Sequence, residues 1–102
     1  MEEKMEREPI SPESIIEDLY HNQISSLMDD LFTKLSLKEY QSDEKWAYII
    51  IKIRNIGYNP IVLNEVKRRY LLKGWGNIFY KLIEDTNEIS FQLYFPQIKS
   101  TI

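Results

Sequence analysis

The chain contains no cysteine, and this absence removes several kinds of chemistry at once. Without thiols it has no disulfides, no thiolate nucleophile and no cysteine ligands for a metal. The single histidine, His21, follows Glu17 by one helical turn, but a metal site needs three or four ligands. We therefore expect a simple pair at these two residues, with no metal and no cofactor bound.

Glycine is also scarce, with three residues among 102. They do not form a glycine-rich loop that cradles phosphates, and no lysine follows them in the required arrangement. Adjacent acids such as Asp29 and Asp30 diverge on a helix, so they make no carboxylate pair. No catalytic residues are predicted, and we expect a protein that is not an enzyme.

Long apolar runs are missing too. The longest, at residues 46–51, is far shorter than the roughly 20 residues that cross a bilayer. The N-terminus has neither the basic nor the apolar region of a signal peptide. These features predict a cytoplasmic protein without membrane contact. Fifteen isoleucines against two valines and one alanine indicate AT-rich coding, a habit of low-GC bacteria, their phages and several large DNA viruses. A phage or viral protein would work in the host cytoplasm.

Charge is divided unevenly along the chain. Residues 1–44 carry twelve acidic and four basic side chains, a net of −8, whereas residues 45–102 carry four acidic and nine basic, a net of +5. One half can hold the other, or meet a charged partner. An acidic helical half can also imitate nucleic acid toward a basic groove on another protein. Two solvated faces of unlike sign are an equal alternative.

The N-terminal half predicts helical structure after a flexible acidic arm at residues 1–9. Ser11 followed by Pro12 is typical of a helix start. Apolar residues between 15 and 20 form one set, and those between 24 and 35 form a stripe that points roughly 90° away from it. We expect a break or kink near residues 21–23, within a single domain at 10–102.

Residues 45–57 give two conflicting signals. Their β-branched isoleucines favour a strand. Their spacing favours a helix, because one helical face collects Trp46, Ile49, Ile50, Ile53 and Ile56. We predict a helix that ends at Gly57 in the left-handed conformation. A capping Asn59 before Pro60 then predicts a further helix from Pro60 to about Lys73.

After Gly76 the apolar pattern changes to the two-residue period of strands. Residues 77–83 and 89–95 both alternate, and the polar residues 84–88 form a loop between them. A two-stranded hairpin is marginal alone, so the helices must pack against it. The predicted fold is α+β, with three to four helices followed by a C-terminal β-hairpin.

The order of helix, tight turn, helix and hairpin over about residues 45–95 resembles winged helix-turn-helix domains. The residues that carry the resemblance are Gly57, Tyr58, Asn59, Leu63 and Val66. It implies that the helix at 60–73 reads nucleic acid and that residues 84–88 form the wing tip. Two features depart from the family pattern. A bulky Ile53 stands where a small residue is usual, and there is no room for the strand that the family usually has between its first two helices. The wing tip also brings three acids, which phosphates repel.

The outward side of the helix at 60–73 combines aliphatic side chains with one arginine. This is more typical of a protein-binding surface than of a base-reading one. We predict a small protein-binding factor: an inhibitor, adaptor or assembly protein with another protein as its partner. The candidate contact residues are Asp29, Asp30, Ile61, Asn64, Arg68, Leu71 and Leu72. The hairpin or the N-terminal helix covering these residues is an equal alternative.

The alternative function is a winged-helix-like regulator that binds nucleic acid and forms a homodimer through its N-terminal helices. Duplex binding would then weaken steeply with salt. The candidate phosphate contacts are Lys52, Arg54, Lys67, Arg68, Arg69 and Lys73.

Overall fold

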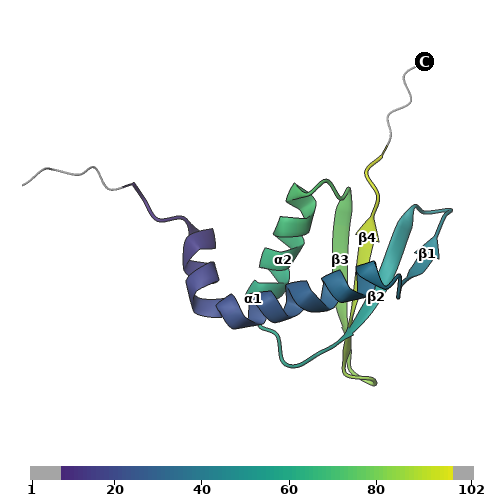
Figure 1. Ribbon diagram of the computed structural model, residues 1–102, viewed down its shortest axis with the longest axis horizontal. Coiled ribbons are helices and arrows are strands. Elements are labelled where there is room, and N and C mark those ends of the chain that lie inside the picture. Colours follow the sequence, from purple (N-terminus) through teal and green to yellow (C-terminus); the bar gives the residue numbers. More distant parts are fainter. Residues whose placement is uncertain (1–7, 98–102) are drawn as a thin grey trace, which may run out of the picture.

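The computed structural model describes residues 8–97, so most of the predicted flexible arm at 1–9 lies outside the described residues. The fold is α+β, with two helices and one four-stranded antiparallel sheet (Figure 1). The elements in chain order are α1 (Pro12–Ser36), β1 (Gln41–Asp43), β2 (Tyr48–Arg54), α2 (Pro60–Leu72), β3 (Asn77–Ile83) and β4 (Glu88–Tyr94). The prediction of three to four helices is wrong, because the described residues form two.

The error lies at residues 45–57, which form a turn and strand β2 instead of a helix. Side chains of β2 alternate: Ile49, Ile51 and Ile53 are buried, and the residues between them point to the other face. β-branched side chains fit a pleated surface better than the wall of a helix. Antiparallel pairing with β1 and β4 supplies the backbone hydrogen bonds that a helix would make internally.

The turns on either side of β2 also differ from the prediction. Asp43 closes the turn before it, because its Oδ1 accepts the N–H groups of Lys45 and Trp46 at 3.1 and 3.3 Å. Gly57 ends no helix. It lies in the loop after β2 with φ of 92°, and Asn55 Oδ1 accepts its N–H at 2.9 Å. Since a strand precedes Gly57, nothing in this architecture identifies a winged helix.

Both helices begin where their capping residues predict. Ser11 Oγ accepts the N–H of Ser14 at 3.2 Å, and Asn59 Oδ1 accepts the N–H of Ile61 at 2.9 Å. Helix α2 ends at Leu72, one residue before the predicted end. Helix α1 is a single element with a kink at Tyr20, where φ is −121° and ψ is 23°. The kink lies one residue before the predicted break.

The sheet has the strand order β1-β2-β4-β3. The predicted hairpin is present as β3 and β4, with Ile78 opposite Leu93 and Tyr80 opposite Phe91, but these are two strands of four. Gly76 lets the start of β3 pass close to the chain after β4, because a Cβ at this residue would lie 2.6 Å from the carbonyl oxygen of Phe95.

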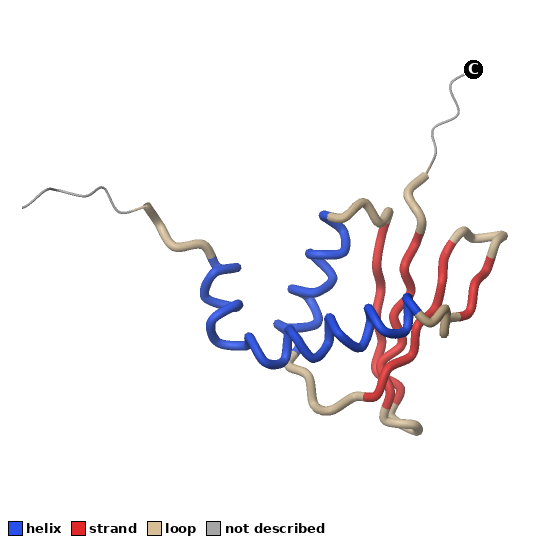
Figure 2. The backbone as a smooth tube through the Cα atoms, in the orientation of Figure 1, coloured by secondary structure: helices blue, strands red, loops and turns tan. Residues whose placement is uncertain are grey.

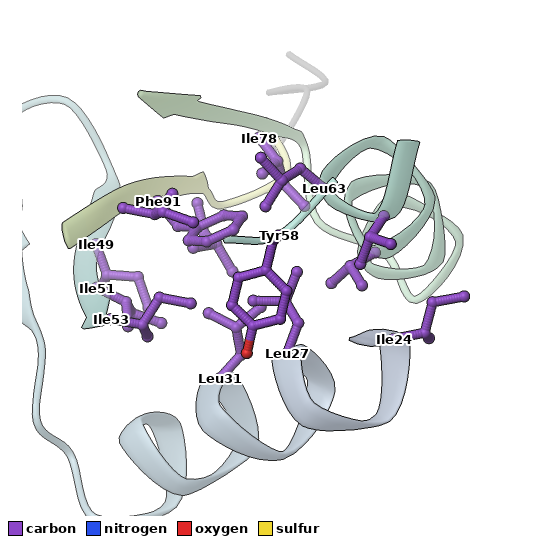
Figure 3. Close-up of a cluster of buried hydrophobic side chains, with 14 residues drawn as sticks. Ile24, Leu27, Leu31, Ile49, Ile51, Ile53, Tyr58, Leu63, Ile78 and Phe91 are labelled. Carbon is purple, nitrogen blue, oxygen red and sulfur yellow. The ribbon is translucent and has the colours of Figure 1, made fainter. Parts of the chain in front are cut away.

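The core lies between the sheet and the helices, which both cover the same face (Figure 2). Figure 3 shows the buried side chains of α1, α2 and the strands meeting in one cluster. Its fully buried members include Leu27, Leu31, Ile51, Val62 and Phe91. Within residues 8–97 no helix covers the opposite face of the sheet, and the first turns of α1 turn away from the sheet (Figure 1).

Candidate functional site

The first two turns of α1, residues 12–19, form a segment that we call the limb. The kink at Tyr20 turns the limb away from the rest of the helix (Figure 1). Two contacts hold the chain just after it to the N-cap of α2. Gln23 Oε1 accepts the N–H of Asn59 at 2.9 Å, and Asn59 Nδ2 donates to the hydroxyl of Tyr20 at 3.5 Å. The kink is therefore fixed by α2, and it sets the direction of the limb.

The apolar stripe of the limb is only partly covered. Ile16 packs against the core, whereas Ile15 is 45% exposed and Leu19 is 70% exposed. Ile15 and Leu19 stand four residues apart, so they share one side of the helix. In the second part of α1, Leu27 and Leu31 are no more than 1% exposed. The limb thus presents apolar side chains that the fold does not use.

Ionic contacts join the limb to α2. Arg69 pairs with Glu17 of the limb and donates from Nε to Glu65 Oε2 at 2.7 Å. Arg68 donates to both carboxylate oxygens of Glu65, at 3.0 and 2.7 Å. Glu65 is 3% exposed, so its charge is removed from water and depends on these two arginines. The network fastens the limb at one point.

These contacts lower the pKa of both carboxylates. Hydrogen bonds from Arg68, supported by Arg69, lower the pKa of Glu65 below its usual 4.5 against the opposing effect of burial. The hydrogen bond from Arg69 lowers the pKa of Glu17 in the same way. Both groups therefore remain negative at neutral pH, and the network is fully formed there.

A hollow of about 310 Å³ separates the limb from α2. The limb lines it with Glu13 and Ile16, and α2 lines it with Ile61, Asn64, Glu65 and Arg68. Asn64 Oδ1 accepts the hydroxyl of Tyr80 at 2.8 Å, which fixes the amide at the wall of the hollow. The exposed Ile61, at 42%, extends the apolar rim of the limb onto α2.

The structure separates the predicted protein-binding residues into three groups: three residues at the hollow, two at the far end of α2, and two acids on α1. Ile61, Asn64 and Arg68 meet at the hollow, as described above. Leu71 and Leu72 are exposed at the far end of α2.

The acids of the same prediction lie elsewhere. Asp29 is exposed on α1, whereas Asp30 Oδ2 accepts the hydroxyl of Tyr58 at 3.2 Å. Sequence reasoning missed Ile15 and Leu19. Their signal was the first apolar set of α1, which points away from the main stripe.

The predicted phosphate contacts do not form one surface. Lys52 and Arg54 lie on β2 and face away from the helices. Lys67 Nζ lies 5.6 Å from the ring centroid of Phe79. Arg68 and Arg69 of α2 are engaged with Glu65, and Lys73 follows the end of that helix.

Other chemistry is sparse in residues 8–97. His21 Nδ1 lies 3.5 Å from Glu17, which is the pair expected from the sequence. Across the described part of the chain, no three histidine or acidic side chains gather as metal ligands. Neither helix within that part is long and apolar enough to span a bilayer.

Comparisons with known proteins gave no match: no protein-family model, no curated protein and no solved structure is similar to this chain.

Proposed function

We propose that this protein acts by binding another protein, and that the limb is the helical segment it inserts into a groove of its partner. The observation that carries the proposal is the exposure of Ile15 and Leu19 on a segment that stands away from the core. Amphipathic helices dock into apolar grooves through anchors at such four-residue spacing. The limb offers these anchors on a fixed support.

The charge of the limb indicates the chemistry of the partner. Glu13, Glu17 and Asp18 give residues 12–19 three acids and no base. Glu17 is already paired with Arg69, whereas Glu13 and Asp18 are exposed. An apolar groove with a basic rim complements this segment. Unlike charges at the rim mainly speed association, and the apolar anchors supply the affinity.

The support of the limb favours binding without a large conformational change. The kink is held by hydrogen bonds around Asn59, and the limb is fastened to Arg69. A helix that is already formed and oriented loses little conformational freedom when it docks. The limb would thus enter the groove as a rigid anchor.

The test compares two exposed apolar residues of the same helix. Leu19 is 70% exposed on the limb, and Phe32 is 68% exposed near the other end of α1. The partner captured from host lysate by the wild-type chain is purified, and its affinity is measured for Leu19→Ser and for Phe32→Ser. We expect Leu19→Ser to weaken the affinity by about 10- to 150-fold, which corresponds to the free energy of burying one leucine side chain. Phe32→Ser should bind like the wild type.

Equal affinity of the wild type and Leu19→Ser would show that the limb is not the docking segment. A loss in Phe32→Ser alone would move the contact to the other end of the helix. Self-association that depends on Leu19, with no second protein captured, would mean that the limb joins two copies of this chain instead.

A further inference from the structure

The face of the sheet opposite the helices carries three aromatic rings in contact. Tyr48 of β2 lies beside Tyr94 of β4, with ring centroids 4.9 Å apart. Phe79 of β3 meets Tyr94 edge-on at 5.7 Å, and its side chain is half exposed. Neighbours on the same strands, such as Ile49 and Leu93, are buried under the helices. The rings are therefore outside the core.

Basic side chains continue along the same face. The register places Lys52, Ser90 and Lys81 in one row across β2, β4 and β3. Ser90 is 5% exposed between the two lysines. Arg54 lies one row further along β2, and Lys45 stands in the turn beyond the rings. Cations therefore lie on both sides of the three rings: Lys45 on one side, and Lys52, Lys81 and Arg54 on the other.

Two acids share this face. Asp43 lies beside Tyr48, and its Oδ1 accepts two backbone N–H groups of the turn. Glu88 lies beside Arg54, at the end of the sheet away from the rings. On the strands this face carries Lys52, Arg54 and Lys81 against Asp43 and Glu88, a net charge of +1, although the whole chain has a net charge of −3. The turn before β2 adds Glu44 and Lys45, whose charges cancel. Desolvation, with a contribution from Asp43, raises the pKa of Tyr48, so its hydroxyl is neutral at physiological pH.

A hollow of about 910 Å³ opens beside the rings, where β3 begins and β4 ends. Its lining includes Trp46, Phe79, Tyr94 and Phe95, and Lys45 is the only charged residue among the described residues that line it. Flat apolar walls with a single cation suit a planar ligand that carries negative charge nearby.

We propose that this open sheet face binds a single-stranded nucleic acid. Bases would stack on Phe79 and Tyr94, and phosphates would meet Lys45, Lys52 and Lys81. Bases stack readily on exposed aromatic rings, and a basic surface follows the backbone. The site lies on the side of the sheet away from the helices, so it goes beyond the protein-binding limb and stands independently of it.

The geometry favours a single strand over a duplex. Paired bases are stacked on each other, so their faces cannot lie on the rings. A helix or ribbon is the element that enters a duplex groove, and this face is a flat sheet. Residues 48–54 extend for about 20 Å, which suits a short segment of extended strand.

The binding test uses fluorescence anisotropy with oligodeoxythymidine and oligouridine of about 15 nucleotides, a length near the upper end of known site sizes. A mixed-sequence duplex of the same length is the comparison. We expect both single strands to bind more tightly than the duplex. Neutralising three phosphates, at Lys45, Lys52 and Lys81, predicts a slope of about −2 in log affinity against log salt.

Matched variants locate the site. Phe79 and Leu82 both lie on β3 and are 49% and 57% exposed, but they point to opposite faces. Phe79→Ser should weaken binding by about 5- to 150-fold, the effect of losing one stacked base. Leu82→Ser should bind like the wild type. Lys81→Glu should weaken binding and flatten the salt slope, whereas Lys73→Glu on α2 should do neither.

Circular dichroism of each variant confirms that the fold is retained before affinities are compared. The proposal is overturned if neither single strand binds at low salt, if the duplex binds equally well, or if Leu82→Ser weakens binding as much as Phe79→Ser. It is also overturned if Phe79→Ser leaves the affinity for the oligonucleotides unchanged but impairs capture of a partner protein, because the face would then be a protein contact.

Discussion

The two ends of α1 use the same kinds of side chain for different purposes. After the kink, Leu27 and Leu31 are buried against the sheet, and before it Ile15 and Leu19 face solvent. The second part is held by extensive apolar packing, whereas the limb is held by the ion pair between Glu17 and Arg69 and by the packing of one side chain, Ile16. Apolar residues in one helix therefore serve either the fold or, as we propose, the partner.

The strands show the same division between their two faces. Ile51 of β2 is fully buried, and its neighbour Lys52 is exposed on the open face. Such alternation lets one strand build the core and a binding surface together. Stability and binding should consequently respond to different substitutions.

The largest expected effect comes from paired truncations on α1. Leu27→Ala removes a side chain that is 0% exposed, and it should lower the free energy of unfolding by about 2–5 kcal/mol. Leu19→Ala, on the limb, should change it by about 0.5 kcal/mol or less. Urea unfolding followed by circular dichroism measures both. A comparable loss for the two variants would show that the limb belongs to the core.

The ionic contacts of the limb should contribute less to the free energy of unfolding than the core does. Arg69→Ala removes the contact with Glu17 and one charge-assisted hydrogen bond to Glu65, which keeps both bonds from Arg68. We expect a loss of about 1–2 kcal/mol in the free energy of unfolding, measured by urea. Lys73→Ala, at the end of the same helix, is the control and should be neutral.

The same network predicts a dependence of stability on pH. The pKa of Glu65 is lower in the folded chain than in the unfolded chain, so its contribution is complete above about 4.5 and is lost as pH falls below that value. The urea midpoint should fall as the pH is lowered from about 4.5 through the lowered pKa of Glu65. Glu65→Gln should be less stable at neutral pH and should show a smaller decrease over this range. An unchanged decrease in this variant would assign the effect to other acids.

The smallest expected change in stability concerns the hydrogen bonds that join Tyr58 to the second part of α1. The hydroxyl of Tyr58 lies 2.9 Å from Ser26 Oγ and 3.2 Å from Asp30 Oδ2, and Figure 3 shows it pointing toward α1. Tyr58→Phe should cost about 0.5–1.5 kcal/mol in urea unfolding. The control is Tyr70→Phe on α2, where burial alone raises the pKa of the hydroxyl. A neutral Tyr58→Phe would show that this hydroxyl contributes nothing to the attachment of α1.

Local chemistry in the sequence predicted a large part of the fold. Three features depend only on neighbouring residues and could therefore be predicted. They are the caps at Ser11 and Asn59, the kink in α1, which lies at Tyr20, and the alternation in β3 and β4. Strand β2 could not be predicted in this way, because its run of isoleucines satisfies both periods. Pairing with β4, whose residues lie about 40 positions later in the chain, makes this segment a strand. Sequence patterns carry little of that long-range information.

The candidate surfaces were predictable only in part. The outward position of Ile61, Asn64 and Arg68 followed from helical periodicity, and the structure adds the limb as the opposite wall. The open sheet face does not follow from the sequence, because the helical spacing at residues 45–57 gives Tyr48 and Tyr94 no reason to be neighbours.

Site-specific photo-crosslinking of the intact protein in host cells, with the crosslinker placed at residue 19 or residue 32 of α1, tests the docking of the limb most directly. We expect the crosslinker at residue 19 to join the chain to one other protein through an apolar groove with a basic rim, and the crosslinker at residue 32 to give no such adduct. Crosslinking of that protein from residue 32 only, or no adduct from residue 19, would contradict the proposal that the limb is the docking segment.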